Sequence, residues 1–282
     1  MKKVSPIISP HDVKRHMKQR NCVLIDARGG PDAGDRFRSG HIRRAVFMDL
    51  ETDLSLKSSD PAHGGRHPLP DPIAFGSVLG KAGIDPSTDV LVYDDKSGAN
   101  AAARFWWMLK AAGHDSIQVV DGGLAALTAA GLPLSSNSDS APKQKEPYPI
   151  KSWKLPLADM EAVDFARRQD DHLVIDVREN YRYRGESEPI DLIAGHIPGA
   201  VNIPFSMNLE PSGRFRSPEA VARLYNEVIG NREARDVIVH CGSGVTACHT
   251  LLAMAVAGLP PAALYVGSWS EWSRNQKPVS IE

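Results

Sequence analysis

A short cysteine-containing segment, CGSGVTA (241–247), is the part of the sequence best suited to nucleophilic chemistry. It follows the apolar run VIVH, typical of a buried strand, and precedes an amphipathic stretch typical of a helix. Gly242 and Gly244 allow a tight turn whose backbone N–H groups point inward and can bind an anion. The positive end of the helix adds to this effect and favours the thiolate of Cys241 over the thiol. The segment therefore predicts a nucleophilic cysteine whose surroundings could also hold an anionic persulfide.

Two other interpretations of Cys241 stay open at this level. A free cysteine at a strand end is often only a small buried residue, as we expect for Cys22 and Cys248. Cysteine phosphatases also place a cysteine before a helix, but they need an arginine six residues later to stabilise the phosphoryl transition state. This chain has Ala247 at that position, which argues against a phosphatase.

The elements that must position this cysteine alternate between short apolar runs and amphipathic stretches. Such alternation predicts an α/β class, with a central parallel sheet flanked by helices. Ligands of open α/β sheets gather at the carboxyl ends of the strands, where Cys241 is expected to lie.

Four landmarks occur twice in the same order and at nearly one spacing, which predicts a tandem pair of similar domains. They are CVLIDAR with HLVIDVR, SGHIRRAVF with AGHIPGAVN, VLVYD with VIVHC, and DGGLAAL with VGSWSEW. We expect a first domain at 1–134, an exposed Ser- and Pro-rich linker at 135–149, and a second domain at 150–282. In the first domain Asp94 stands where Cys241 stands in the second, so only the second is expected to be catalytic.

The composition of the 282 residues is that of an ordinary soluble protein, with 42% hydrophobic and 24% charged residues and a net charge of -1. It has no basic excess for nucleic acid or a membrane surface, and no run approaches the roughly 18 apolar residues of a membrane span. Three cysteines do not make a disulfide framework, which favours the cytoplasm. We expect no metal and no cofactor, since His249 lacks a second ligand at metal spacing.

On these motifs, with GRHPLP (65–70) and GSWSEW (267–272), the chain resembles the tandem-domain rhodanese family. The CGSGVTA segment resembles the active-site loop of the 3-mercaptopyruvate sulfurtransferases within that family. The resemblance implies two rhodanese-type α/β domains and a sulfurtransferase that moves sulfur from a small-molecule donor, through a persulfide on Cys241, to an acceptor. The acceptor would be cyanide, a small thiol or a thioredoxin-like protein.

The resemblance also implies roles for individual residues. Arg182, with help from Arg184, would bind the donor's carboxylate, because a planar guanidinium matches a carboxylate well. His67 would relay a proton to the departing enolate, and Ser243 would be the nearer proton donor. The expected catalytic residues are Cys241 and Ser243, and the expected donor-binding residues are His67, Arg182, Arg184, Gly242, Gly244, Val245 and Thr246. Asp191 departs from the pattern, because the mercaptopyruvate enzymes have a second arginine there.

The choice of donor depends on the charge of the loop. Thiosulfate-preferring relatives carry two basic residues where this chain has Gly242 and Ser243. A cation contributes up to about 4 kcal/mol at 4 Å, whereas a neutral hydrogen bond contributes about 0.5–1.5 kcal/mol. The loop therefore favours mercaptopyruvate over the thiosulfate dianion, although Asp191 argues the other way. Two alternatives remain: a thiosulfate:cyanide sulfurtransferase and a non-enzymatic rhodanese-like binding module.

Overall fold

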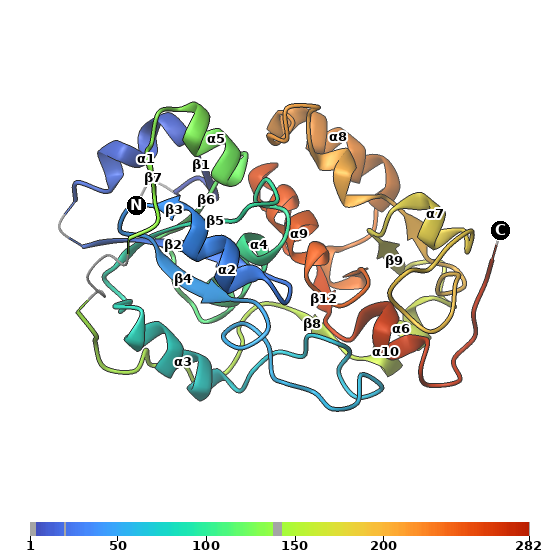
Figure 1. The fold of residues 1–282 in the computed structure, drawn as a ribbon. Coiled ribbons are helices and arrows are strands. Elements are labelled where there is room, and N and C mark those ends of the chain that lie inside the picture. Colours follow the sequence, from blue (N-terminus) through green and yellow to red (C-terminus); the bar gives the residue numbers. More distant parts are fainter. Residues whose placement is uncertain (1–3, 20, 138–142, 282) are drawn as a thin grey trace. The chain divides into compact units, whose positions relative to one another are not determined.

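The computed structural model describes residues 4–19, 21–137 and 143–281 of the chain. Their contacts divide the chain into two compact units. The described residues of Met1–Leu56, Pro70–Lys154 and Pro211–Arg214 form the first unit. Those of Lys57–Leu69, Leu155–Glu210 and Phe215–Glu282 form the second. Each unit is built around its own parallel sheet, which confirms the predicted fold class (Figure 1).

The elements of the first unit alternate along the chain as the sequence predicts. They are β1 (Ile7–Ile8), α1 (Pro10–His16), β2 (Cys22–Arg28), α2 (Ala33–Ser39), β3 (His41–Ile42), β4 (Val46–Asp49), α3 (Pro72–Lys81), β5 (Asp89–Tyr93), α4 (Ala101–Ala111), β6 (Ile117–Val120), α5 (Gly123–Ala129) and β7 (Leu134–Ser135). The parallel sheet has the order β1-β6-β5-β2-β4, and β3 pairs with β7 separately. Apolar side chains of α1 and α5 share a buried cluster with β2 and β5, so the helices bury the aliphatic strand residues.

The second unit repeats this plan. Its elements are β8 (Leu157–Ala158), α6 (Met160–Ala166), β9 (Leu173–Asp176), α7 (Asn180–Tyr183), β10 (Val201–Asn202), the 3₁₀ turn η1 (Phe205–Asn208), α8 (Pro218–Ile229), the 3₁₀ turn η2 (Ala234–Asp236), β11 (Val237–His240), α9 (Thr246–Val256), β12 (Ala263–Tyr265) and α10 (Ser268–Trp272). The sheet order β8-β12-β11-β9-β10 corresponds strand by strand to that of the first unit. Asp94 and Cys241 therefore follow corresponding central strands, β5 and β11.

The loop after β5 surrounds the side-chain carboxylate of Asp94. The buried carboxylate of Asp94 accepts hydrogen bonds from the backbone N–H groups of Lys96, Gly98, Asn100 and Ala102, at 2.7–3.1 Å. Burial raises the pKa of Asp94, against the opposite effect of these four donors. A loop at this place in the fold thus directs its N–H groups at the residue that directly follows the strand, here Asp94.

The segment before the second unit differs from the expected exposed linker at 135–149. Residues 138–142 lie outside the described part of the chain. Further on, Tyr148 is buried, and its backbone N–H donates to the carbonyl of Gly76 in α3 at 2.9 Å. The next turn of α3 offers Gly80, whose carbonyl accepts from Lys145 at 2.9 Å. The two glycines leave a groove without Cβ atoms, so this part of the segment packs on the first unit.

His249 on α9 is a fully buried histidine in the core of the second unit. Its ring stacks on Phe215 with centroids 4.8 Å apart and meets Phe205 edge-on at 5.9 Å. Within the described residues, neither ring nitrogen has a hydrogen-bond partner. Burial lowers the pKa of His249 to about 3, so the folded unit keeps this ring neutral when the unfolded chain would protonate it.

Replacing His249 with Phe should therefore change how stability depends on pH. Below about pH 6.5 the unfolded wild type takes up a proton that the folded state refuses, so stability falls as the pH drops toward 3. For one such histidine the slope is about 1.4 kcal/mol per pH unit. Denaturant titrations between pH 7 and 4 should show a shallower loss for the variant. Parallel curves for the two proteins would contradict this account.

Candidate active site

The expected nucleophile lies in a tightly held loop, residues 241–245, between β11 and α9; we call it the cysteine loop. All five residues of the loop are buried, and Cys241 is 2% exposed. Gly244 has a φ of +71°. A Cβ atom there would lie 2.6 Å from the carbonyl oxygen of Val266. The chain can therefore pass between the strand and the helix only with glycine at this position.

Helix α10 holds the loop from one side through its backbone. The N–H of Trp269 donates to the carbonyl of Cys241 at 3.0 Å, and the N–H of Ser270 donates to that of Gly242 at 2.9 Å. The hydroxyl of Ser268 accepts from the N–H of Cys241 at 3.2 Å. Ser268 has a φ of +54°, which is uncommon for a residue with a side chain, and its hydroxyl faces the backbone N–H of Cys241.

The other two cysteines lie in different surroundings. Burial, together with the charge of Asp89, raises the pKa of Cys22 to about 11, which suppresses its thiolate. Cys248 is fully buried in α9, and its thiol donates to the carbonyl of Gly244 at 3.3 Å. Cys248 thus lies in the core as expected from the sequence, whereas Cys22 is only partly buried and packs against the core of the first unit.

A segment distant in sequence, residues 57–69, belongs to the second unit and packs on α10. The N–H of Gly64 donates to the carboxylate of Glu271 at 2.7 Å, and the N–H of Arg66 donates to the hydroxyl of Ser270 at 3.1 Å. A Cβ on Gly65 would collide with the backbone of Gly267, so the two segments are in close contact. These contacts place residues 66 and 67 beside the cysteine loop.

His67 lies beside the cysteine loop. Its Nδ1 is 2.8 Å from the hydroxyl of Ser243, which is 6% exposed. Which of the two atoms donates depends on the histidine tautomer. The contact joins two of the residues that the sequence singled out for proton transfer.

Arg182 on α7 also faces the cysteine loop. Its Nε and Nη2 donate to the carboxylate of Glu188 at 3.1 and 2.7 Å. Its Nη2 and Nη1 lie 3.5 and 3.6 Å from the position of a Cβ on Gly242. Burial raises the pKa of Glu188, but the bond from Arg182 and the backbone donors outweigh it, so the pKa is lowered overall. Glu188 is therefore a charged anchor that holds the Arg182 guanidinium in place.

Arg184, two residues later, points elsewhere. Its side chain is 49% exposed and pairs with Glu186 at 2.8 Å. The contacts described for it include none with the cysteine loop. Thr246, the first residue of α9, is half-buried at the end of the loop.

Asp191 has surroundings that sequence reasoning missed. Its fully buried carboxylate accepts from the guanidinium of Arg66, from Arg274 at 3.1 Å and from Arg182 at 3.4 Å. Arg178, which pairs with Asp176, also contacts Glu188 at 3.3 Å, so four arginines and three carboxylates form the group and leave one net positive charge. The only signal in the sequence was the arginine beside His67 in GRHPLP.

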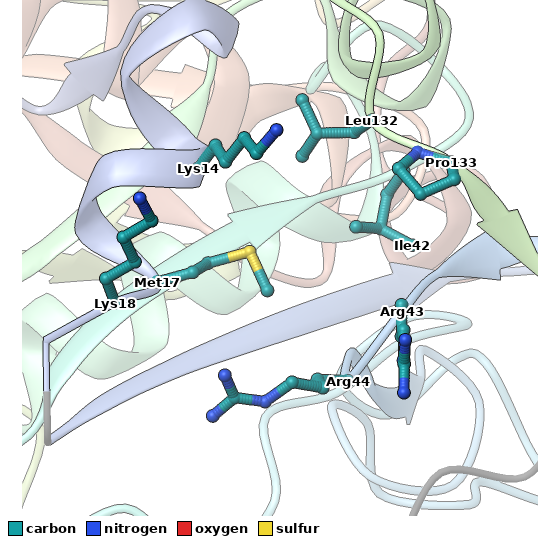
Figure 2. Close-up of a pocket in the computed structure, with 8 residues that line it drawn as sticks. All are labelled: Lys14, Met17, Lys18, Ile42, Arg43, Arg44, Leu132 and Pro133. Carbon is teal, nitrogen blue, oxygen red and sulfur yellow. The ribbon is translucent and has the colours of Figure 1, made fainter.

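The first unit has a pocket of about 220 Å³ with an apolar wall and a basic rim (Figure 2). It is lined by Lys14, Met17, Lys18, Ile42, Arg43, Arg44, Leu132 and Pro133. None of the residues proposed to act on sulfur lines it, so we assign the pocket no part in the chemistry of Cys241. Across residues 4–19, 21–137 and 143–281, no three His, Cys, Asp or Glu side chains gather as a metal site would require. No helix in the same ranges is long and apolar enough to cross a membrane.

Comparisons with known proteins agree with this fold. The model of the rhodanese-like domain matches twice, at residues 9–130 and 161–275. A Pseudomonas aeruginosa protein named "Probable 3-mercaptopyruvate sulfurtransferase" is 38% identical over 97% of this chain and 97% of its own length. Thiosulfate sulfurtransferase of Gallus gallus is 34% identical over 88% of this chain and 83% of that protein. The structure of 3-mercaptopyruvate sulfurtransferase from Leishmania major aligns with a TM-score of 0.82 at 28% identity, covering 98% of this chain and 76% of that one.

The two matches of the domain model define a tandem pair of rhodanese-like domains. The chain belongs to the rhodanese family, and it is a sulfurtransferase. The resemblance inferred from the sequence is confirmed.

The close packing of Gly244 leads to a test of the loop geometry. Gly244→Ala should cost about 1–3 kcal/mol of stability, because its backbone would be strained. It should also cut turnover about 100-fold, since small displacements of a nucleophile are costly. Thermal unfolding and steady-state rates measure the two effects. Gly258→Ala is the matched control, because Gly258 has a φ of +74° and an added methyl there meets nothing within 4 Å, so it adds backbone strain outside the site. An equal loss of turnover in the two variants would overturn the assignment.

Proposed function

We propose that this sulfurtransferase takes sulfur from 3-mercaptopyruvate, holds it as a persulfide on Cys241 and passes it to a thiol. The proposal depends on one observation: a positively charged guanidinium group lies close to the loop that contains the nucleophilic cysteine. Cys241 lies directly after β11 and before α9, and the anchored guanidinium of Arg182 lies in front of the next residue, Gly242. A donor with a thiol and a carboxylate fits such an arrangement.

The corresponding loop of the first unit supports the persulfide. Asp94, in the corresponding position, is an anion that accepts four backbone N–H groups. We propose that Gly242, Gly244, Val245 and Thr246 offer their N–H groups to the outer sulfur of Cys241 in the same way. The first domain is then non-catalytic because its own carboxylate occupies the anion site, and the catalytic domain is completed by residues 57–69.

The first chemical step moves one sulfur atom. The Cys241 thiolate attacks the thiol sulfur of mercaptopyruvate, an S–S bond forms and the C–S bond breaks. The electron pair of the broken bond leaves on carbon as the enolate of pyruvate. The cysteine sulfur is oxidised to the persulfide level, and the carbon that lost sulfur is reduced.

The enolate needs a proton to leave as pyruvate. Ser243 and His67, in contact at 2.8 Å, are suited to deliver it. We propose that the Ser243 hydroxyl donates to the enolate carbon and that His67 restores the hydroxyl proton. Arg182 holds the carboxylate meanwhile, and Arg184, at the exposed end of α7, has at most a supporting role.

The second step returns the enzyme to its starting state. An acceptor thiolate, or cyanide, attacks the outer persulfide sulfur, and the Cys241 thiolate leaves. We propose a small thiol or a thioredoxin-like protein as the acceptor, and the cytoplasm as the compartment. All three cysteines are free in the structure, as such an exchange at a single thiol requires.

Thiosulfate is the alternative donor, since relatives that act on it align over most of the chain. Arg66 and Arg182, beside Gly242, belong to an ion-pair group with one net positive charge, because its four arginines are balanced by three carboxylates. One positive charge suits the single carboxylate of mercaptopyruvate better than a dianion. The other alternative, a non-enzymatic binding module, would not need the nucleophile Cys241 or a loop that holds it in place, so the site disfavours it.

The persulfide can be observed directly. Incubation with mercaptopyruvate and no acceptor should add one sulfur, roughly +32 in mass, removable by cyanide or dithiothreitol. Peptide mapping should place it on Cys241. Cys241→Ser should gain nothing, and Cys248→Ser should gain as much as the wild type. An equal adduct on Cys22 or Cys248 would place the chemistry elsewhere.

The donor preference is tested by a side-by-side rate measurement. With cyanide as common acceptor and equal donor concentrations, mercaptopyruvate should be turned over faster than thiosulfate. Raising the salt concentration should slow thiosulfate more, because a dianion depends more on long-range attraction. A faster thiosulfate reaction in the unmodified protein would make thiosulfate the preferred donor.

A further inference from the structure

Two guanidinium groups, from different parts of the chain, converge on the space in front of Gly242. The Nη2 atom of Arg66 lies 3.2 Å from the position of a Cβ on this glycine, and Nη2 of Arg182 lies 3.5 Å from it. Arg182 belongs to α7, whereas Arg66 comes from the segment that packs on α10. The absence of a side chain at residue 242 leaves this position open to a donor that approaches Cys241.

We infer that Arg66 is a second carboxylate-binding residue of the donor site, opposite Arg182. The inference rests on the proposed function and adds to it the residue that determines selectivity for carboxylate donors. A carboxylate has two oxygens and accepts a fork of N–H groups on each side. Nitrogen atoms from two guanidinium groups near one point bind a carboxylate with more geometric selectivity than those of one group do.

Each arginine is held in the same manner, by a buried carboxylate behind it. Glu188 accepts from Nε and Nη2 of Arg182, and Asp191 accepts from Nη1 of Arg66. The side chains of Glu188 and Asp191 are 3% and 0% exposed. Anchored guanidinium groups lose less conformational entropy on binding than free ones.

The backbone of Arg66 is fixed as firmly as its side chain. Its N–H donates to Ser270, and the preceding Gly65 packs directly on Gly267. The following residue, His67, contacts Ser243. One dipeptide therefore serves two neighbouring loop positions, with Arg66 in front of Gly242 for binding and His67 at Ser243 for proton transfer.

Arg66→Gln tests this inference, with Arg274→Gln as the matched control. Arg274 also donates to Asp191, at 3.1 Å, but is not among the nearest neighbours of the Gly242 Cβ position. Each variant is assayed with 3-mercaptopyruvate and with mercaptoacetone, which replaces the carboxylate by a methyl group and keeps the thiol and ketone. Persulfide formation from mercaptoacetone also shows whether a variant has kept its fold.

We expect Arg66→Gln to raise the KM for mercaptopyruvate on the order of 10- to 150-fold, with a much smaller change in kcat. Its kcat/KM for mercaptoacetone should stay near the wild-type value. Arg66→Lys should fall between, because it keeps the charge and loses the fork. The KM change for Arg274→Gln should be several times smaller than for Arg66→Gln.

Equal effects of Arg66→Gln and Arg274→Gln would show that Arg66 only supports Asp191, and would overturn the inference. A loss of the same size with both donors would overturn it as well. If the unmodified protein takes no sulfur from mercaptopyruvate, the proposed function fails first, whatever the variants do. The wild-type rate therefore separates the two failures.

Discussion

Two backbone hydrogen bonds from α10 to the carbonyls of Cys241 and Gly242 hold the geometry on which the site depends. The same short helix offers Ser270 and Glu271 to residues 64–66. It therefore fixes the nucleophile on one side and the segment with Arg66 and His67 on the other. Backbone bonds and glycine contacts leave little freedom to adjust, so the reacting groups are positioned before a donor arrives.

Buried carboxylates decide what the arginines of the site can do. Asp191 and Glu188 compensate most of the positive charge around Gly242 and hold each guanidinium from behind. An unanchored arginine would swing into solvent, and an uncompensated cluster would be costly to bury. Asp191, which seemed from the sequence to weaken carboxylate binding, is the residue that holds Arg66 in place.

The two units have the same fold but different chemical roles. Both sheets have the same strand order, and an ionisable residue, Asp94 or Cys241, directly follows each central strand. In the first unit the loop N–H groups are satisfied by Asp94. We attribute sulfur chemistry to the second unit because a thiolate at that position can accept a sulfur atom and release it again, whereas a carboxylate cannot.

The sequence by itself determined the α/β class, the duplication and the cysteine loop, whereas the roles of His67 and Arg182 stay predictions from the resemblance. Those features depend on local order along the chain: strand-like runs, glycines before a helix, and motifs that occur twice. Tertiary structure alone decided that residues 57–69 join the second unit, that residues 143–150 pack on α3, and that Arg66 meets Asp191. These contacts join residues far apart in sequence, and their formation depends on packing and burial, which no local pattern encodes.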